Sequence, residues 1–426
     1  ELYEAGGIIA QSEANATQLF GTARTYYSTE GSSQCIRAML HLALQMRPAK
    51  AGRPVLLAAR NAHKALLYAA ALLDFDIQWL WPAPDAAGAL CTCPVEPEAL
   101  ASALDELAAE GRTPFGVYLT SPDYLGFVQD IAGLSAVCHA HGLPLLVDNA
   151  HGAYLHFLKE GGRHPIQLGA DLCCDSAHKT LPVLTGGAYL HLGTSVQADE
   201  ATVRNALALF GSTSPSYLIL QSLDAANAVL ADGFREKLDI CRWRLGMLCR
   251  ELDALRPGLA LPLTGAHREP LKLTLDAAAL GLSGQQLAQA LRERGVECEY
   301  ADPRYVVLMP SAESSAAEFA CLQTALHAIC DEASAADVSV TADDPAAFAA
   351  LAGALEAQPR RFTIREAVLA PQEMIPAAEA VGRICAAPAV SCPPAIPIVV
   401  SGETVPPEAL PLFARYGIEK AAVVKE

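Results

Sequence analysis

The chain has 426 residues, of which 52% are hydrophobic and 18% charged, and this composition excludes a largely disordered protein. Its 30 Lys and Arg residues against 47 Asp and Glu residues give a formal net charge of −17 at pH 7. The overall field therefore repels nucleic-acid phosphates and anionic membrane surfaces, and we expect neither as a partner.

The sequence favours the cytoplasm as the compartment. No stretch approaches the roughly 20 consecutive apolar residues of a membrane-spanning helix, and the first residues lack the basic region of an export signal. The 13 cysteines are scattered, and the close pairs Cys91/Cys93 and Cys173/Cys174 match neither zinc nor redox spacing, so we expect no metal. The chain opens with Glu1 in a helix-like pattern, and we expect native residues to precede it.

Short apolar runs alternate with helical patterns through the first half of the chain. The runs, which we expect to be strands, span residues 54–58, 77–81, 115–120, 143–147, 172–175 and 188–192. The expected helices span residues 35–46, 62–73, 96–110, 128–141 and 217–252. Because the runs lack polar alternation, they indicate parallel strands buried on both faces, joined by right-handed crossovers. Residues 1–255 are therefore predicted to form a large α/β domain with a mainly parallel sheet.

The pattern changes after Pro257. Strands are expected over 270–275, 296–299 and 305–309, and helices over 285–294 and 313–332. Residues 256–336 are thus predicted to form a smaller α/β domain, and the Ala- and Pro-rich residues 337–426 a C-terminal domain. Neither a GxGxxG fingerprint nor a GxxxxGK[ST] loop occurs, so nicotinamide and nucleoside triphosphates are not the first choice of ligand.

Two residues at expected strand ends suggest a cofactor. Asp148 follows the run 143–147, at the edge where open α/β sheets bind ligands, and Lys179 follows the run 172–175. A lysine amine can form a Schiff base with an aldehyde, and a carboxylate can keep a pyridine nitrogen protonated, so the pair suits pyridoxal 5′-phosphate (PLP). The pair by itself is more typical of an ordinary strand-end aspartate and a surface lysine than of a cofactor site.

Two further features are compatible with the same cofactor. Gly31, Ser32 and Ser33 precede a helical pattern, where free backbone amides favour a phosphate, although an ordinary helix cap has the same sequence. His63 follows another expected strand and could stack on a flat ring, or could be an ordinary hydrogen-bonded histidine.

Several motifs, in order and spacing, resemble the ornithine/lysine/arginine decarboxylases, which are PLP enzymes of fold type I. The core motifs are DNAHGA (148–153), GAD (169–171), SAHKTLP (176–182) and TGGAYLH (185–191). The resemblance extends to TSPDYLG (120–126), TSPSY (213–217), PPAIP (393–397) and SGE (401–403), and so covers nearly the whole chain. It implies an aspartate-aminotransferase-like large domain and a PLP-dependent carbon–carbon lyase.

The resemblance also implies roles for individual residues. Lys179 would form the Schiff base, Asp148 would hold the ring nitrogen, and His63 would stack on the ring. Further cofactor contacts are implied for Ser32, Ser33, His151, Ser176 and His178. His178 or Lys179 would return a proton to the α-carbon.

Members of this family are dimers or larger assemblies, which implies at least a homodimer here. Ser212 and Thr213 would then reach the neighbour's cofactor phosphate. The chain departs from the family at Asn149, where many relatives have Glu, and at Ala395, where they have Gly. The family's N-terminal His-Met-Pro-Gly-His-Lys stretch is absent.

The expected reaction is decarboxylation of arginine, lysine or ornithine to agmatine, cadaverine or putrescine. Which of these is the substrate stays open in the sequence. A buried distal cation needs a carboxylate, and Glu403 is the predicted partner. Two alternatives stay open: a PLP aminotransferase with an arginine clamp, and a degenerate homologue that binds polyamines or a protein partner.

Overall fold

The computed structural model describes residues 2–4, 6–49, 52–83, 91–159, 161–263, 265–333, 345–359, 361–387, 390–392 and 396–426. Within them, the six strands predicted in the first half of the chain and one further strand, β1, form a seven-stranded sheet in the order β1-β7-β6-β5-β4-β2-β3. The strands are β1 (Arg24–Ser28), β2 (Val55–Ala59), β3 (Asp76–Leu80), β4 (Val117–Thr120), β5 (Leu145–Asp148), β6 (Leu172–Asp175) and β7 (Ala188–Leu192). Strands β2 to β6 run parallel, and β7 is antiparallel to β1 and β6. The predicted mainly parallel sheet is confirmed.

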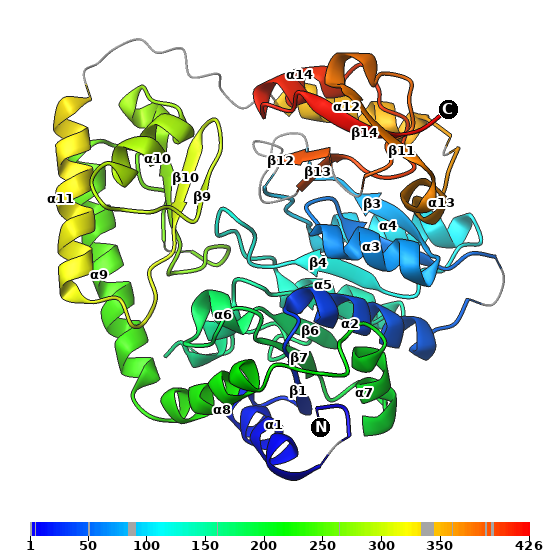
Figure 1. Ribbon diagram of the computed structural model, residues 1–426, viewed down its shortest axis with the longest axis horizontal. Helices are drawn as coiled ribbons and strands as arrows, with labels where there is room; N and C mark the ends of the chain where they lie inside the picture. Colours follow the sequence, from blue (N-terminus) through cyan, green and yellow to red (C-terminus); the bar gives the residue numbers. More distant parts are fainter. Residues whose placement is uncertain are drawn as a thin grey trace.

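Helices cover both faces of this sheet (Figure 1). Successive strand residues point to opposite faces, so β2 sends Leu56 and Ala58 to one cluster and Leu57 and Ala59 to the other. The first cluster contains α2 (Ser32–Met46), α3 (Lys64–Leu73) and α7 (Glu200–Ala208); the second contains α4 (Pro97–Ala109) and α5 (Ile131–Ala140). Burial on both faces explains why the strands read as uninterrupted apolar runs. Further elements of this domain are α1 (Gly7–Phe20), η1 (Ala153–Phe157) and α6 (Ala177–Thr180).

The expected helix over 217–252 is two helices. Asp232 and Gly233 separate α8 (Tyr217–Ala231) from α9 (Phe234–Leu255), and Gly233 has a φ of 76°, a conformation that glycine adopts without strain. Helix α9 leads to the smaller domain, where it lies beside α11 (Figure 1).

The smaller domain is built on an antiparallel sheet in the order β8-β10-β9. Its elements are β8 (Leu273–Asp276), η2 (Ala277–Leu280), α10 (Gly284–Arg292), β9 (Tyr300–Ala301), β10 (Tyr305–Leu308) and α11 (Ala316–Glu332). The strand expected over 296–299 is wrong, because this segment bonds to β10 only from Glu299 onward, where the Glu299 N–H donates to the Val307 carbonyl.

The C-terminal segment packs against both domains. Its elements are α12 (Pro345–Ala357), α13 (Ile364–Leu369), β11 (Gln372–Pro376), η3 (Ala377–Glu379), β12 (Val390–Cys392), β13 (Ile396–Val399), α14 (Ala409–Arg415) and β14 (Lys420–Val424). Its cluster includes Tyr300 and Val307 of the smaller domain and Leu125 of the large one. The predicted boundary at 336/337 and the family position Ala395 lie outside the described residues.

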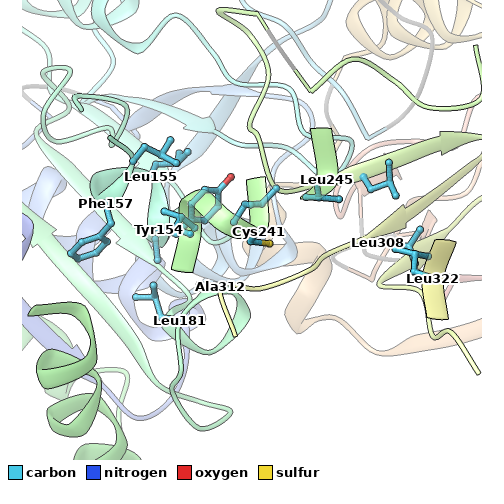
Figure 2. Close-up of a cluster of buried hydrophobic side chains, with 14 of the residues drawn as sticks. Tyr154, Leu155, Phe157, Leu181, Cys241, Leu245, Leu308, Ala312 and Leu322 are labelled. Carbon is cyan, nitrogen blue, oxygen red and sulfur yellow. The ribbon is translucent and has the colours of Figure 1, made fainter. Parts of the chain in front are cut away.

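A hydrophobic cluster connects the large and small domains (Figure 2). Tyr154 and Leu181 come from the large domain, Leu245 comes from α9, and Leu308 and Leu322 come from the smaller domain. This shared core places the smaller domain beside the carboxyl ends of the parallel strands. In the described part of the chain, each helix is too short or too polar to cross a membrane.

Candidate active site

A pocket lies at the carboxyl ends of the parallel strands, the edge at which such sheets bind ligands. It is lined by residues that follow successive strands: His63 after β2, Tyr124 after β4, His151 after β5 and Lys179 after β6. Asp148, the last residue of β5, and Ser32, at the start of α2, complete this set. The structure thus brings together six residues from separate parts of the sequence, five of which were predicted as site residues.

Lys179 lies in α6 and points its amine at His151. The Lys179 Nζ atom is 2.9 Å from His151 Nε2 and 5.6 Å from the centre of the Tyr124 ring. Burial lowers the pKa of Lys179, although Asp148 acts in the opposite direction. Burial also lowers the pKa of His151 well below its usual value. A larger share of the Lys179 amine is therefore neutral and nucleophilic than in an exposed lysine.

Asp148 is a buried carboxylate with three hydrogen-bond donors, one of which is the Cys174 thiol, 3.6 Å from Oδ1. Tyr118 on β4 donates its hydroxyl to Oδ2 over 3.1 Å, and the Ala150 N–H donates to Oδ1 over 3.2 Å. Burial and the charge of Asp148 raise the pKa of Tyr118 well above its usual value, so Tyr118 stays a donor. This arrangement orients a negative charge at the pocket.

The start of α2 offers an anion site beside these groups. Gly31 precedes the helix with a φ of 73°, and no side chain caps the first turn. Ser32 and Ser33 are the first two helical residues, and the Ser176 hydroxyl donates to the Ser32 hydroxyl over 2.7 Å. Uncapped amides with hydroxyls beside them suit a phosphate.

His63 and Asn61 complete the wall after β2. His63 caps α3, its Nδ1 accepting the Ala65 N–H over 3.2 Å, and burial lowers its pKa. Both amide atoms of the Asn61 side chain are buried without a hydrogen-bond partner, which is unusual unless a ligand supplies one. The pocket therefore combines the Lys179 amine, the oriented Asp148 carboxylate, the uncapped start of α2 and the Asn61 amide without a partner. This set of groups is suited to binding PLP.

Other predicted residues lie outside the pocket lining. His178 is next to Lys179, but its Nδ1 lies 3.0 Å from the Gly187 carbonyl. Ser33 and Ser176 do not line the pocket, although Ser176 contacts it indirectly through its hydrogen bond to Ser32.

Ser212 and Thr213 are exposed and are not among the residues that line this pocket. The Ser212 hydroxyl accepts the N–H of Ser214 over 3.1 Å. The predicted contact of this loop with a neighbouring subunit stays a prediction.

Glu403 is buried rather than solvated, and the structure does not bring it to this pocket. Its two carboxylate oxygens accept hydrogen bonds from Arg60 over 2.8 and 2.9 Å. The Arg60 guanidinium lies 4.8 and 4.7 Å from the ring centres of Trp79 and Trp81. The Val400 N–H also donates to Glu403, so this carboxylate joins the C-terminal segment to the end of β2.

Lys272 is a site neighbour that the sequence reasoning missed. It is buried, donates to the Asp123 carbonyl over 2.7 Å and lies 5.8 Å from the centre of the Tyr124 ring. The amine groups of Lys179 and Lys272 therefore both lie near the Tyr124 ring. A lysine between Leu271 and Leu273 in an expected strand was the signal that could have identified it.

Asp175 accounts for the departure at Asn149. The Asn149 side-chain amide donates to Asp175 Oδ1 over 2.6 Å, and His164 and His191 each place Nε2 3.1 Å from Oδ2. These partners lower the pKa of Asp175 despite its burial. A glutamate at 149 would bury two facing carboxylates, whereas Asn149 ties the segment after β5 to the end of β6. His164, Cys173 and Asp175 also bring three possible metal-ligand atoms within 4.8 Å of one another.

Comparisons with known proteins identify the family of this chain. The family model for the major domain of Orn/Lys/Arg decarboxylases matches residues 1–241. An uncharacterized protein, YaaO, of Bacillus subtilis is 28% identical over 422 residues, covering 97% of this chain and 83% of the relative. The arginine decarboxylase of the same organism is 28% identical over 418 residues, covering 96% and 81%.

Solved structures extend this likeness to the three-dimensional fold. The constitutive lysine decarboxylase of Escherichia coli superposes with a TM-score of 0.74 at 20% identity, over 99% of this chain and 71% of that one. The lysine decarboxylase of Francisella novicida gives a TM-score of 0.75 at 18% identity, over 100% and 73%. The predicted fold type I architecture is confirmed.

Proposed function

This chain belongs to the Orn/Lys/Arg decarboxylase family, and from this membership we propose that it removes the α-carboxyl group of arginine, lysine or ornithine as CO2. The products are CO2 and the corresponding amine. The observation that carries the proposal is that Lys179 and Asp148 line one pocket at neighbouring strand ends, beside the uncapped start of α2.

The same residues would hold the cofactor that this family uses. The start of α2, with Ser32, Ser33 and Ser176, would bind the phosphate, and His178 would lie beside it. His63 would face the ring from the segment after β2.

When bound, PLP supplies an electron sink for the pair of electrons that stays behind as CO2 leaves. Asp148 would keep a proton on the ring nitrogen, with Tyr118 and the Ala150 N–H fixing its carboxylate. Lys179 would return a proton to the α-carbon, because its amine reaches the pocket while His178 bonds to a backbone carbonyl.

The pocket lining argues against the two alternatives. An aminotransferase needs an arginine for the α-carboxylate, and no arginine is among the described residues that line this pocket. A degenerate homologue has no need to keep Lys179, Asp148 and His63 in one pocket.

We also propose that the enzyme is a homodimer in the cytoplasm. The loop with Ser212 and Thr213 is exposed, as are Tyr217 and Leu218 next to it, which leaves an apolar surface for a second subunit. The cysteines that the structure describes form no disulfides, as suits a reducing compartment.

Supplying the purified protein with PLP and each of the three basic amino acids tests the reaction. We expect CO2 and an amine in equal amounts from at least one substrate, and no keto acid. Keto acid without CO2 would favour the aminotransferase, and no turnover with visible bound cofactor would favour the degenerate homologue.

A further inference from the structure

If the substrate is a basic amino acid, as proposed above, its distal ammonium or guanidinium must meet a negative charge. Leaving such a cation buried and unpaired costs several kcal/mol. The described carboxylates around the pocket can therefore be compared by what already binds them.

The two carboxylates that line the pocket are both engaged. Asp148 is bound as described above. Asp123 accepts the N–H groups of Leu125 and Phe127 on Oδ1, over 2.9 and 2.8 Å, and the Thr92 hydroxyl on Oδ2. Asp123 has no oxygen left without a donor, so it does not serve as the partner of the substrate's cation.

Two buried carboxylates farther out are also engaged. Glu269 accepts the Tyr154 hydroxyl and the Leu271 N–H, and it is the strongest counter-charge for Lys272. Glu403 holds Arg60 with both oxygens, and releasing it would leave a buried guanidinium without a partner.

Glu299 differs from all of these. It lies immediately before β9, its side chain is exposed, and within the described part of the chain its carboxylate has no hydrogen bond or ion pair. The next residue, Tyr300, packs its ring 5.6 Å from that of Tyr124, and its hydroxyl lies 3.1 Å from the Cys91 Sγ atom. Tyr124 and Cys91 both line the pocket. Glu299 is therefore next in sequence to a residue of the smaller domain that packs against the pocket wall.

The negative charge of Glu299 affects the pKa values of groups that line the site. Burial raises the pKa of Tyr124, and Glu299 raises it further. Glu299 also counteracts the burial that lowers the pKa of Lys179. Glu299 also raises the pKa of Lys272, but Glu269 and Asp123 raise it more strongly. Lys272 is therefore paired mainly with these two residues, and Glu299 is available for another cation.

We propose that Glu299 binds the distal cation of the substrate and thereby selects basic amino acids. The stem of lysine carries its ammonium about 6 Å from the α-carbon. Such a reach suits a partner on the edge of the smaller domain, across from the large-domain residues that would hold the cofactor.

The substitution Glu299→Gln in the PLP-loaded enzyme tests this. We expect KM for the preferred basic amino acid to rise about 10- to 100-fold, as for loss of a hydrogen bond to a charged group, with most of the effect in KM rather than kcat. The preference for lysine over its uncharged analogue norleucine should fall by a similar factor. Glu297→Gln is the matched control, because Glu297 is an exposed neighbour that pairs with Arg292 over 3.0 Å; it should change neither quantity.

Calorimetric binding of agmatine, cadaverine and putrescine to both proteins separates this assignment from the proposed reaction. If the unsubstituted enzyme binds one of these amines at least tenfold more tightly than Glu299→Gln, the assignment holds even when no CO2 is released. An unchanged KM, an unchanged preference over norleucine, or equal amine affinities would overturn it.

Discussion

The amine of Lys179 lies 2.9 Å from Nε2 of His151, whose pKa is lowered well below its usual value by burial and by the nearby charges of Lys272 and Lys179. His151 is therefore an uncharged partner that holds the amine in place without adding a positive charge. Its Nδ1 atom is buried without a partner. The site thus positions its nucleophile with a neutral imidazole, and the charge beside it comes from Asp148.

Replacing Lys179 by alanine should abolish the visible absorbance of lysine-linked cofactor and the release of CO2, because no other lysine is among the described residues that line the pocket. Absorbance spectra and CO2 assays of the purified variant measure this. Lys64→Ala is the control, since Lys64 is exposed at the start of α3. Retained absorbance and turnover in Lys179→Ala would remove Lys179 from its assigned role.

Replacing Asp148 by asparagine should leave the cofactor bound but lower kcat by about 10²- to 10³-fold or more. An amide cannot hold a proton on the ring nitrogen, and losing one central electrostatic group commonly costs about 3–4 kcal/mol. Steady-state kinetics with cofactor content measured in the same samples distinguish the two effects. Turnover close to that of the unsubstituted enzyme would contradict the role of Asp148.

Replacing Glu403 by glutamine should lower the free energy of unfolding by about 3–5 kcal/mol, because Arg60 is left buried with an uncompensated charge. Urea denaturation measures this. Glu373→Gln is the control: Glu373 pairs with Arg383 at the surface, where such pairs contribute about 1 kcal/mol or less. If Glu403→Gln instead keeps its stability and raises KM for basic substrates, Glu403 rather than Glu299 binds the distal cation.

Stability should fall as the pH is lowered from 6.5 to 4. Burial lowers the pKa of His156 to about 4, so within this window the unfolded chain takes up a proton that the folded chain does not. The unfolding free energy is therefore highest above pH 6.5 and decreases toward pH 4. His156→Gln should reduce this decrease by about 1–3 kcal/mol in urea denaturation at pH 7 and 4.5. His141→Gln, at an exposed site, is expected to leave the slope unchanged.

The enzyme should sediment as at least a dimer, since the loop with Ser212 and Thr213 is expected to reach a second subunit. Obligate interfaces of this kind bury on the order of 2,000 Å² or more. Leu218→Glu should weaken the assembly, because Leu218 is 69% exposed beside this loop, whereas Leu72→Glu on α3 should not. A fully active monomer in sedimentation velocity would be incompatible with the expectation.

The sequence by itself determined the sheet and the residues at its edge. Strands β6 and β7 match the predicted ranges 172–175 and 188–192, because strands buried on both faces must be continuously apolar. Lys179, Asp148 and His63 follow such strands, and the geometry of a parallel sheet then brings their segments to one edge. The edge strand β1 was missed, since its residues Arg24–Ser28 are not a continuous apolar run.

Only the tertiary structure decided which charges pair. Glu403 meets Arg60 from 343 positions away, Asn149 meets Asp175, and the Glu299 carboxylate has no hydrogen bond or ion pair with the residues that the structure describes. Local patterns encode burial and chain direction, but the partner of a buried charge depends on which distant segments pack together. The local sequence around a glutamate is the same whether its carboxylate binds a buried arginine or faces solvent. The sequence analysis therefore placed the distal-cation partner at Glu403, whereas the packing of the folded chain leads us to propose Glu299.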